Sequence, residues 1–215
     1  MTIPAPLTRS LFVLSIFYGG MVCIAGVLGN KQVALGPLAV EAGIFAFLLL
    51  VAVSSAIAEL HGRATANQLV RFGFIPLLAS MLLSWLVWAL PASPKMGPEY
   101  RDAIQLILGT TWRIWGAGIV AYGVSQTLNV TIFSAMRGGE GSKMLWLRAG
   151  VAGILSQIVD TLIFITLAFY GEFPIGPLLV GQLISKIALS ALLVPVLIYA
   201  FVALGRHLDR NAPAA

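Results

Sequence analysis

The chain has 215 residues, of which 59% are hydrophobic and only 10% charged, and its mean hydropathy is +0.96. Soluble domains are about 45–50% apolar and about 25% charged, so this composition indicates an integral membrane protein. Because a helical span needs about 20 apolar residues, we expect roughly six spans in a single transmembrane domain, residues 1–215, without room for a soluble catalytic or ATP-hydrolysing domain. A lone cysteine, Cys23, argues against a disulfide framework or a thiol metal site.

Long apolar runs separate the charged residues, and we expect each run to form a helix that crosses the membrane. In chain order these runs are Leu11–Leu28, Leu38–Leu60, Phe72–Leu90, Ile114–Met136, Leu147–Tyr170 and Leu178–Leu204. The connection Ala92–Trp112 mixes prolines and charges with an apolar stretch, so it is either a short amphipathic helix on the membrane surface or a plain loop. The predicted fold class is an all-α, polytopic membrane helical bundle.

The basic residues predict the orientation of the bundle. With six spans, the two termini and the second and fourth loops share one face, which carries Arg9, Arg63, Arg71, Arg137, Lys143, Arg148, Arg206 and Arg210. The opposite face carries fewer basic residues, namely Lys31, Lys95, Arg101 and Arg113. The positive-inside rule therefore predicts that both termini lie in the cytoplasm, in a multi-pass protein of the inner (cytoplasmic) membrane.

The fourth and fifth runs repeat one polar motif. Residues 125–133 (SQTLNVTIF) and 156–164 (SQIVDTLIF) share the pattern Ser-Gln-x-x-Asn/Asp-x-x-Ile-Phe. Residues three and four apart share one face of a helix, so each motif forms a polar patch, with Asn129 in the first and Asp160 in the second. Gln126 and Gln157 each lie about 15 Å from the cytoplasmic end of their span, so we expect the patches to face each other. Their amides either bind a substrate or join helices by hydrogen bonds.

Asp160 and Lys186 are ionisable residues deep within predicted spans. A charge at mid-membrane costs about 2.5–3.5 kcal/mol on insertion scales, so such a residue is a functional-site candidate. A buried lysine needs an anion or carbonyl groups, and Asp160 is the natural partner. We therefore expect the fifth and sixth spans to be neighbours, whether the pair binds a substrate or is purely structural.

The first half of the chain carries a weaker cluster at the end of the second run. There Glu59 is a candidate functional carboxylate, or it forms a hydrated loop network with His61 and Arg63. Glu41 and Lys31 are interpreted as charges at the membrane interface. The sequence contains no nucleophile–base motif, histidine pair or phosphate-binding glycine loop, so we predict no enzyme, no bound cofactor and no metal site.

Several segments make the chain resemble the queuosine-precursor transporter family, six-helix membrane proteins also known as vitamin-uptake-transporter-like. They are residues 58–63 (AELHGR), 121–130 (AYGVSQTLNV), 146–148 (WLR) and 156–164 (SQIVDTLIF), with Phe133, Arg137, Lys186 and Pro195. The resemblance covers most of the chain from Asn30 onward. It implies import of 7-deazaguanine bases, 7-cyano-7-deazaguanine or 7-aminomethyl-7-deazaguanine, for salvage into the queuosine of tRNA. The chain departs from the family at Asn129, where Asp is common, and at Ser54-Ser55, where Thr-Asp is frequent.

The chemistry of such a base suits these polar residues. A guanine-like ring presents adjacent N–H donors, which a carboxylate accepts in a bidentate pair, and a carbonyl, which needs a donor. We expect Asp160 to accept from the donor edge and a glutamine amide or Lys186 to donate to the carbonyl. Aromatic residues such as Tyr122, Phe133, Phe164 or Trp115 either stack on the ring or only pack. The predicted substrate-binding residues are Asp160, Gln157, Gln126, Asn129, Lys186 and Glu59.

The sequence leaves the mechanism open. A carrier working alone would rock groups of helices around a mid-membrane site, with Glu59 or Asp160 relaying protons. The alternative is a substrate-binding membrane subunit of an energy-coupling-factor-type transporter for another small heterocyclic, vitamin-like compound. The expected partners are the small-molecule base and the lipid bilayer, without nucleic acid. Small residues such as Gly116 and Gly118 permit close helix packing within the protein or in a homo-oligomer.

Overall fold

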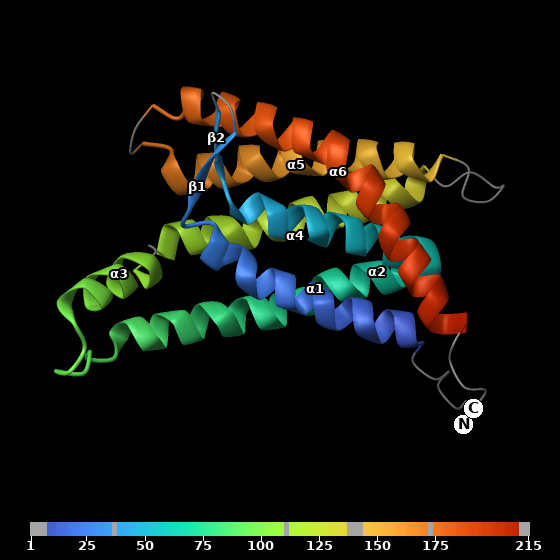
Figure 1. Cartoon of the computed structure of the whole chain (residues 1–215). Coiled ribbons are helices and arrows are strands. Elements are labelled where there is room, and N and C mark those ends of the chain that lie inside the picture. Colours follow the sequence, from blue (N-terminus) through green and yellow to red (C-terminus); the bar gives the residue numbers. More distant parts are fainter. Residues whose placement is uncertain (1–7, 36–37, 110–111, 137–143, 172–173, 211–215) are drawn as a thin grey trace.

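The computed structural model describes residues 8–35, 38–109, 112–136, 144–171 and 174–210 of a helical bundle (Figure 1). Its elements are α1 (Arg9–Leu28), β1 (Gln32–Leu35), β2 (Leu38–Glu41), α2 (Gly43–Ala89), α3 (Pro98–Leu108), α4 (Trp112–Ala135), α5 (Leu145–Phe169) and α6 (Gly176–Arg210). Within the described residues, α1, α2, α5 and α6 are long and apolar enough to cross a membrane. These features confirm an all-α membrane bundle. Arg137 and Lys143 lie outside the described residues, and the cytoplasmic placement of the termini stays a prediction.

One helix occupies the region of the second and third predicted spans. The backbone of α2 is helical over 47 residues except at Gly62, where φ is 85° and ψ is 163°. Figure 1 shows that the first part of α2 runs toward the end of the bundle that holds both chain termini, and that the later part runs back. The two spans are therefore present, but the segment between Leu60 and Phe72 is helical on either side of a sharp bend, where a loop was expected.

The predicted start of the second span at Leu38 is wrong. Residues 32–35 and 38–41 form an antiparallel hairpin that pairs Gln32 with Glu41 and Val33 with Val40, and α2 begins only at Gly43. The apolar residues from Leu38 to Val40 continue directly into the apolar helix. In a short apolar run, the periodicity of the sequence does not distinguish a strand from the first turn of a buried helix, so the sequence predicts too early a start for this span.

The connection between the third and fourth predicted spans contains a helix, α3. Of the two alternatives for this segment, an amphipathic helix or a plain loop, the helix is therefore correct. Pro98 occupies the first turn of α3 and Glu99 follows it, both of which favour a helix start. None of the α3 residues is buried. Figure 1 places α3 at the end of the bundle opposite the chain termini, near the hairpin.

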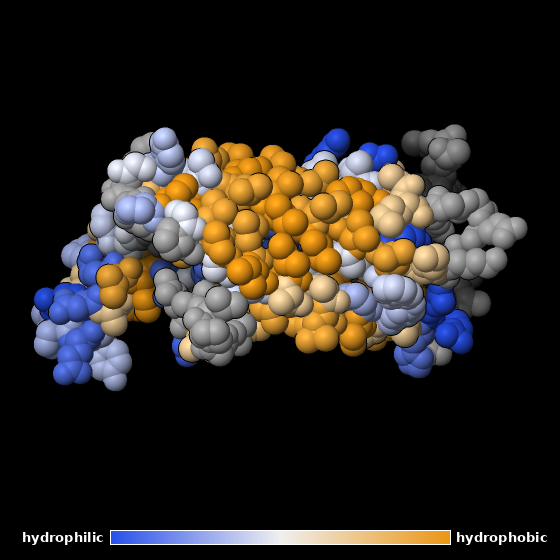
Figure 2. Space-filling view, turned by 90° about the horizontal axis from the view of Figure 1, so that it is seen from above, coloured by the Kyte–Doolittle hydropathy of each residue, from blue (hydrophilic) through white to orange (hydrophobic). Residues whose placement is uncertain are grey.

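The outer surface has the pattern of a protein surrounded by lipid. Figure 2 shows hydrophobic residues across the middle of the bundle and hydrophilic residues toward its two ends. The later part of α2 contributes Phe72, Ile75 and Leu82, each more than 60% exposed. Contiguous exposed apolar surface of this kind marks contact with a membrane or a partner.

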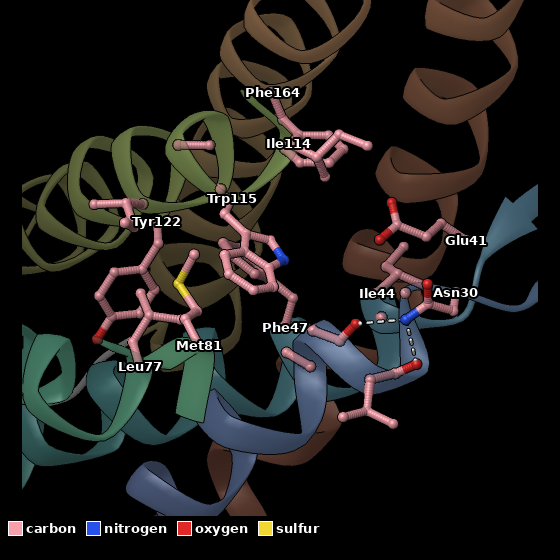
Figure 3. Close-up of a pocket in the computed structure, with 18 of the residues that line it drawn as sticks. Asn30, Glu41, Ile44, Phe47, Leu77, Met81, Ile114, Trp115, Tyr122 and Phe164 are labelled. Carbon is pink, nitrogen blue, oxygen red and sulfur yellow. Dashed lines mark hydrogen bonds between the residues drawn. The ribbon is translucent and has the colours of Figure 1, made fainter. Parts of the chain in front are cut away.

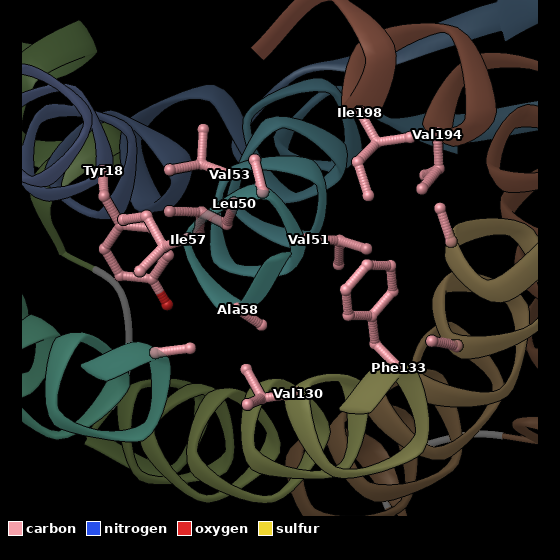
Figure 4. Packing of buried hydrophobic residues seen from close by; sticks show 14 of the residues in the cluster. Tyr18, Leu50, Val51, Val53, Ile57, Ala58, Val130, Phe133, Val194 and Ile198 are labelled. Atoms are coloured by element: carbon pink, nitrogen blue, oxygen red, sulfur yellow. The ribbon is translucent and has the colours of Figure 1, made fainter. Parts of the chain in front are cut away.

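The buried core joins α1, α2, α4, α5 and α6. Tyr18, Leu50, Val51, Phe133 and Ile198 are at most 1% exposed and lie in one cluster (Figure 4). Helix α5 packs between α4 and α6, so the expected adjacency of the fifth and sixth spans is confirmed. This arrangement brings the polar residues of three helices together.

The bend at Gly62 yields the first prediction. Its φ and ψ lie in a region that is essentially restricted to glycine, while no other atom lies within 4 Å of a Cβ placed there. We expect Gly62→Ala to cost about 1–3 kcal/mol of folding free energy through backbone strain alone. The measurement is the melting temperature of the detergent-solubilised protein. The control is Gly20→Ala, a lipid-facing helical position with equally open surroundings; equal melting temperatures for the two variants would contradict the prediction.

Candidate functional site

A cavity of about 550 Å³ lies between the helices at the end of the bundle that carries the hairpin and α3. Its wall is built from α1, β2, α2, α3, α4, α5 and α6, and most of its lining residues are apolar. A cavity of this size with a few polar groups fits a small organic molecule. The charged residues among the described lining are Glu41, Asp160 and Lys186.

Asp160 and Lys186 form a buried ion pair that borders this cavity. Lys186 Nζ on α6 lies 3.2 Å from Asp160 Oδ2 on α5, and each side chain is 8% exposed. Ser125 Oγ on α4 donates to Asp160 Oδ1 at 3.2 Å. The ion pair predicted from the sequence is therefore confirmed, and three helices meet at it.

The two copies of the repeated motif lie against each other but make different contacts. Ser125 of the first motif contacts Asp160 of the second, whereas the equivalent Ser156 donates to the carbonyl of Gly153 in its own helix. Asn129, the counterpart of Asp160, does not line the cavity. The repeat is therefore symmetric in sequence and asymmetric in structure, because Asp160 lines the cavity and its counterpart Asn129 does not.

Asn129 belongs to a buried hydrogen-bonded group with two serines of α2. Its Nδ2 donates to Ser54 Oγ and Ser55 Oγ at 3.0 Å each. Ser54 Oγ in turn donates to Gln126 Oε1 at 3.3 Å. These are the positions at which the sequence departs from the family it resembles. An amide donor and two hydroxyl acceptors are neutral and mutually complementary, so these contacts need no counter-charge, although Asn129 Oδ1 has no partner among the described residues.

The glutamines of the motif are completely buried and incompletely hydrogen-bonded. Gln126 and Gln157 are 0% exposed and do not line the cavity. Gln157 Nε2 and Oε1 and Gln126 Nε2 have no partner within the part of the chain that the structure describes. Gln182 lies one turn before Lys186 and lines the cavity, and its Oε1 also lacks a partner. Buried polar atoms without partners are costly, so these amides are available to a ligand or to a second arrangement of the helices.

Glu59 lies outside the cavity and pairs with a basic residue of α5. Its Oε2 is 2.9 Å from Arg148 Nη1, and each of the two side chains is 4% exposed. Arg148 also donates to the carbonyl oxygen of Phe133 and lies 4.2 Å above the centre of its ring. His61 instead contacts Ser10, and Arg63 contacts Thr131, so of the two alternatives given for Glu59, the network with His61 and Arg63 is wrong.

Glu41 is the charged residue of the described cavity wall that is absent from the predicted substrate-binding residues. It ends β2, outside the spanning helices, and its Oε1 packs against the backbone of Gly29 and Gly43. Burial raises the pKa of the Glu41 carboxyl, and the nearby charges of Lys186 and Asp160 act on it in opposite directions. In the sequence, Glu41 is an acidic residue at the edge of an apolar run, and this pattern is the same for a charge at the membrane interface and for a charge that lines a cavity.

Aromatic residues from several helices line the cavity. Trp115, Tyr122, Phe164 and Phe47 are among them, and Figure 3 shows how these side chains lie. Tyr122 Oη donates to the carbonyl oxygen of Val70 at 3.1 Å and lies 3.0 Å from Tyr18 Oη. The tyrosine pair thereby ties α1, α2 and α4 together beside the cavity. Of the aromatic candidates named from the sequence, Phe133 alone is elsewhere, beneath Arg148.

The structure thus has the organisation of a membrane transport protein: an apolar exterior, a cavity that enters the bundle from one end, and buried charges beside that cavity. The chain belongs to the family described as "Putative vitamin uptake transporter", which matches residues 41–200. It is a multi-pass membrane protein of that transporter family.

One curated relative comes from Bacillus subtilis (strain 168) and is described as "Probable queuosine precursor transporter". It is 32% identical over 150 residues, which span 67% of this chain and 63% of the relative. The match therefore covers less than two thirds of the relative's length. No solved structure matches the chain significantly.

The ion pair yields the second prediction. Lys186→Met leaves Asp160 buried without its counter-charge, which costs about 3–5 kcal/mol, whereas replacing both members of such a pair is often nearly neutral. We expect Lys186→Met to lower the melting temperature of the purified protein by several degrees. The double variant Asp160→Asn/Lys186→Met should recover most of that loss. The control is Lys95→Met, which removes an exposed lysine outside the cavity. A double variant that is less stable than Lys186→Met would contradict this account of the pair.

Proposed function

We propose that this protein imports 7-deazaguanine queuosine precursors, 7-cyano-7-deazaguanine or 7-aminomethyl-7-deazaguanine, across the inner membrane for the salvage of tRNA queuosine. The observation that carries the proposal is the Asp160–Lys186 pair at a cavity of small-molecule size. Membership of the vitamin uptake transporter family and the relative described as a queuosine precursor transporter support it.

The cavity offers the hydrogen-bonding groups that a guanine-like base requires. The Asp160 carboxylate would accept from the adjacent N–H donors of the base, and the Lys186 ammonium would donate to its carbonyl. The free Oε1 of Gln182 supplies a further acceptor beside them. Trp115 and Phe164 line the same cavity and provide flat apolar surface for the ring. A base with donors on one edge and an acceptor on another would thus satisfy both members of the ion pair.

The remaining buried polar residues suggest how the base would continue across the membrane. With both termini in the cytoplasm, the cavity would open to the outside. Gln126, Asn129 and Gln157 are fully buried, and the Arg148–Glu59 pair and its contacts with Phe133 lie near the start of α5, the bend of α2 and the end of α4. In an alternating-access cycle, these groups would separate and their unpartnered amide atoms would contact the base.

The proposal is tested by the queuosine content of tRNA. The host is a bacterium that can neither synthesise deazaguanine precursors nor import them, supplied with nanomolar 7-cyano- or 7-aminomethyl-7-deazaguanine. We expect queuosine to appear only when this chain is expressed, without any further added component. Absence of queuosine for both bases, with the protein present in the membrane, would contradict the proposal and direct attention to an energising partner or another heterocycle.

The third prediction concerns the Asp160 carboxylate. Asp160→Asn keeps the size and the Ser125 contact but replaces one acceptor with an amide donor, so we expect at least about a tenfold loss in the initial rate of queuosine formation. The stability-restored variant Asp160→Asn/Lys186→Met should also be inactive. Asp102→Asn on the exposed face of α3 is the matched control and should match the wild type. Wild-type uptake by the double variant would show that the pair is structural and does not bind substrate.

A further inference from the structure

The charges that line the cavity do not balance. Asp160 and Lys186 compensate each other at 3.2 Å, whereas the Glu41 carboxylate makes no hydrogen bond or ion pair with the described residues. No further charged side chain occurs among the described residues of the cavity wall. With the three groups ionised, the cavity therefore carries one uncompensated negative charge, and that charge is on Glu41.

The backbone is built to accommodate this carboxylate. A Cβ on Gly29 would lie 2.5 Å from Glu41 Oε1, and a Cβ on Gly43 would lie 3.3 Å from it. The absence of side chains at these two positions lets the carboxylate pack against the end of α1 and the start of α2. Glu41 is thus held in the cavity wall by steric fit, without a polar side chain that neutralises it.

The position of Glu41 allows it to share a ligand with the ion pair. Glu41 lines the same cavity as Lys186 and Asp160, although it comes from a different element of the fold. Figure 3 shows Glu41 together with the Trp115 ring among the side chains that surround the cavity. A flat molecule within the cavity would therefore have Asp160 and Lys186 near one part of its edge and Glu41 near another.

Burial disfavours the ionised Glu41 carboxylate and raises its pKa, so either a proton or a cation beside it relieves the cost. An ammonium group of a ligand within hydrogen-bond distance would supply that cation together with a charge-assisted hydrogen bond. Among the described residues, the ion pair of Lys186 is with Asp160, and no hydrogen bond joins Lys186 to Glu41. A ligand that carries its own cation would therefore interact with the ionised Glu41 more favourably than a neutral ligand of the same shape.

We propose that Glu41 binds an ammonium group of the transported molecule, so that the cavity prefers a flat heterocycle with a charged primary amine over its neutral counterpart. This inference rests on the proposed function and sharpens it. Of the two bases, 7-aminomethyl-7-deazaguanine carries such an amine at neutral pH, and 7-cyano-7-deazaguanine does not. The aminomethyl base is therefore the preferred substrate, and Glu41 is the residue that determines this preference.

The test compares both bases in the queuosine assay with wild type and Glu41→Gln at equal membrane abundance. We expect wild type to import the aminomethyl base with the lower half-saturating concentration. Glu41→Gln should raise that concentration roughly tenfold or more for the aminomethyl base and leave the cyano base within about twofold. Glu99→Gln, which removes an exposed carboxylate of α3 outside the cavity, is the matched control and should change neither value.

The outcomes separate the inference from the proposed function. If wild type imports neither base, the proposed function fails. If wild type imports both bases and Glu41→Gln impairs both equally, or neither, transport stands and Glu41 does not select the amine. An equal loss of uptake for the two bases would instead indicate that Glu41 has a role common to all substrates, such as proton transfer.

A measurement on the wild type alone covers the case in which Glu41→Gln does not accumulate in the membrane. Uptake of labelled 7-cyano-7-deazaguanine is competed with the unlabelled aminomethyl base or with its neutral isostere, 7-hydroxymethyl-7-deazaguanine. The proposal predicts that the aminomethyl base competes at least about tenfold more effectively. Equal competition by the amine and the alcohol would overturn it.

Discussion

Two opposite charges, Asp160 on α5 and Lys186 on α6, lie 3.2 Å apart within a bundle whose exterior is apolar. Either charge alone would be expensive at membrane depth, so each fixes the position of the other. Ser125 on α4 donates to the same carboxylate, which joins a third helix to the pair. The cavity lies beside this junction, at the hairpin end of the bundle. The ion pair is therefore the polar contact at which α4, α5 and α6 meet, and the candidate site lies at this junction.

The two ends of the bundle differ in a way that suits alternating access. At the end with the chain termini, Ser10 Oγ donates to Asp209 Oδ2 and contacts His61 Nε2, both at 2.7 Å, which ties together α1, α2 and α6. The Arg148–Glu59 pair joins α5 to α2. The opposite end is hollow, and its wall combines aromatic surface with the three cavity charges. Between them lie buried amides that are only partly hydrogen-bonded. Among the described residues, the bundle thus has a cavity at one end and direct side-chain contacts between helices at the other.

The sequence predicts the features that a membrane requires, namely apolar spans and paired buried charges. The apolar run ending at Leu28 coincides with the end of α1, and Asp160 was correctly paired with Lys186 because few partners exist for a charge at that depth. The sequence does not predict contacts that depend on packing between segments far apart along the chain. Arg148, the partner of Glu59, is 89 residues away along the chain, and the sequence pattern predicts only a loop charge at this position. The cavity position of Glu41 depends on a hairpin whose apolar residues look like the start of a helix. Gly62 likewise reads as part of a loop, although a single residue outside helical geometry is enough to reverse the direction of α2.

The most direct test of this account is equilibrium binding of labelled 7-aminomethyl-7-deazaguanine to the purified protein in lipid nanodiscs, for wild type and for Asp160→Asn/Lys186→Met. The account predicts saturable binding of the base by the wild type, displaced by excess unlabelled base. It predicts no saturable binding by a double variant that is folded and thermally stable. Equal affinity of the two proteins would show that the ion pair only holds the helices together, and the candidate site would have to be sought elsewhere in the bundle.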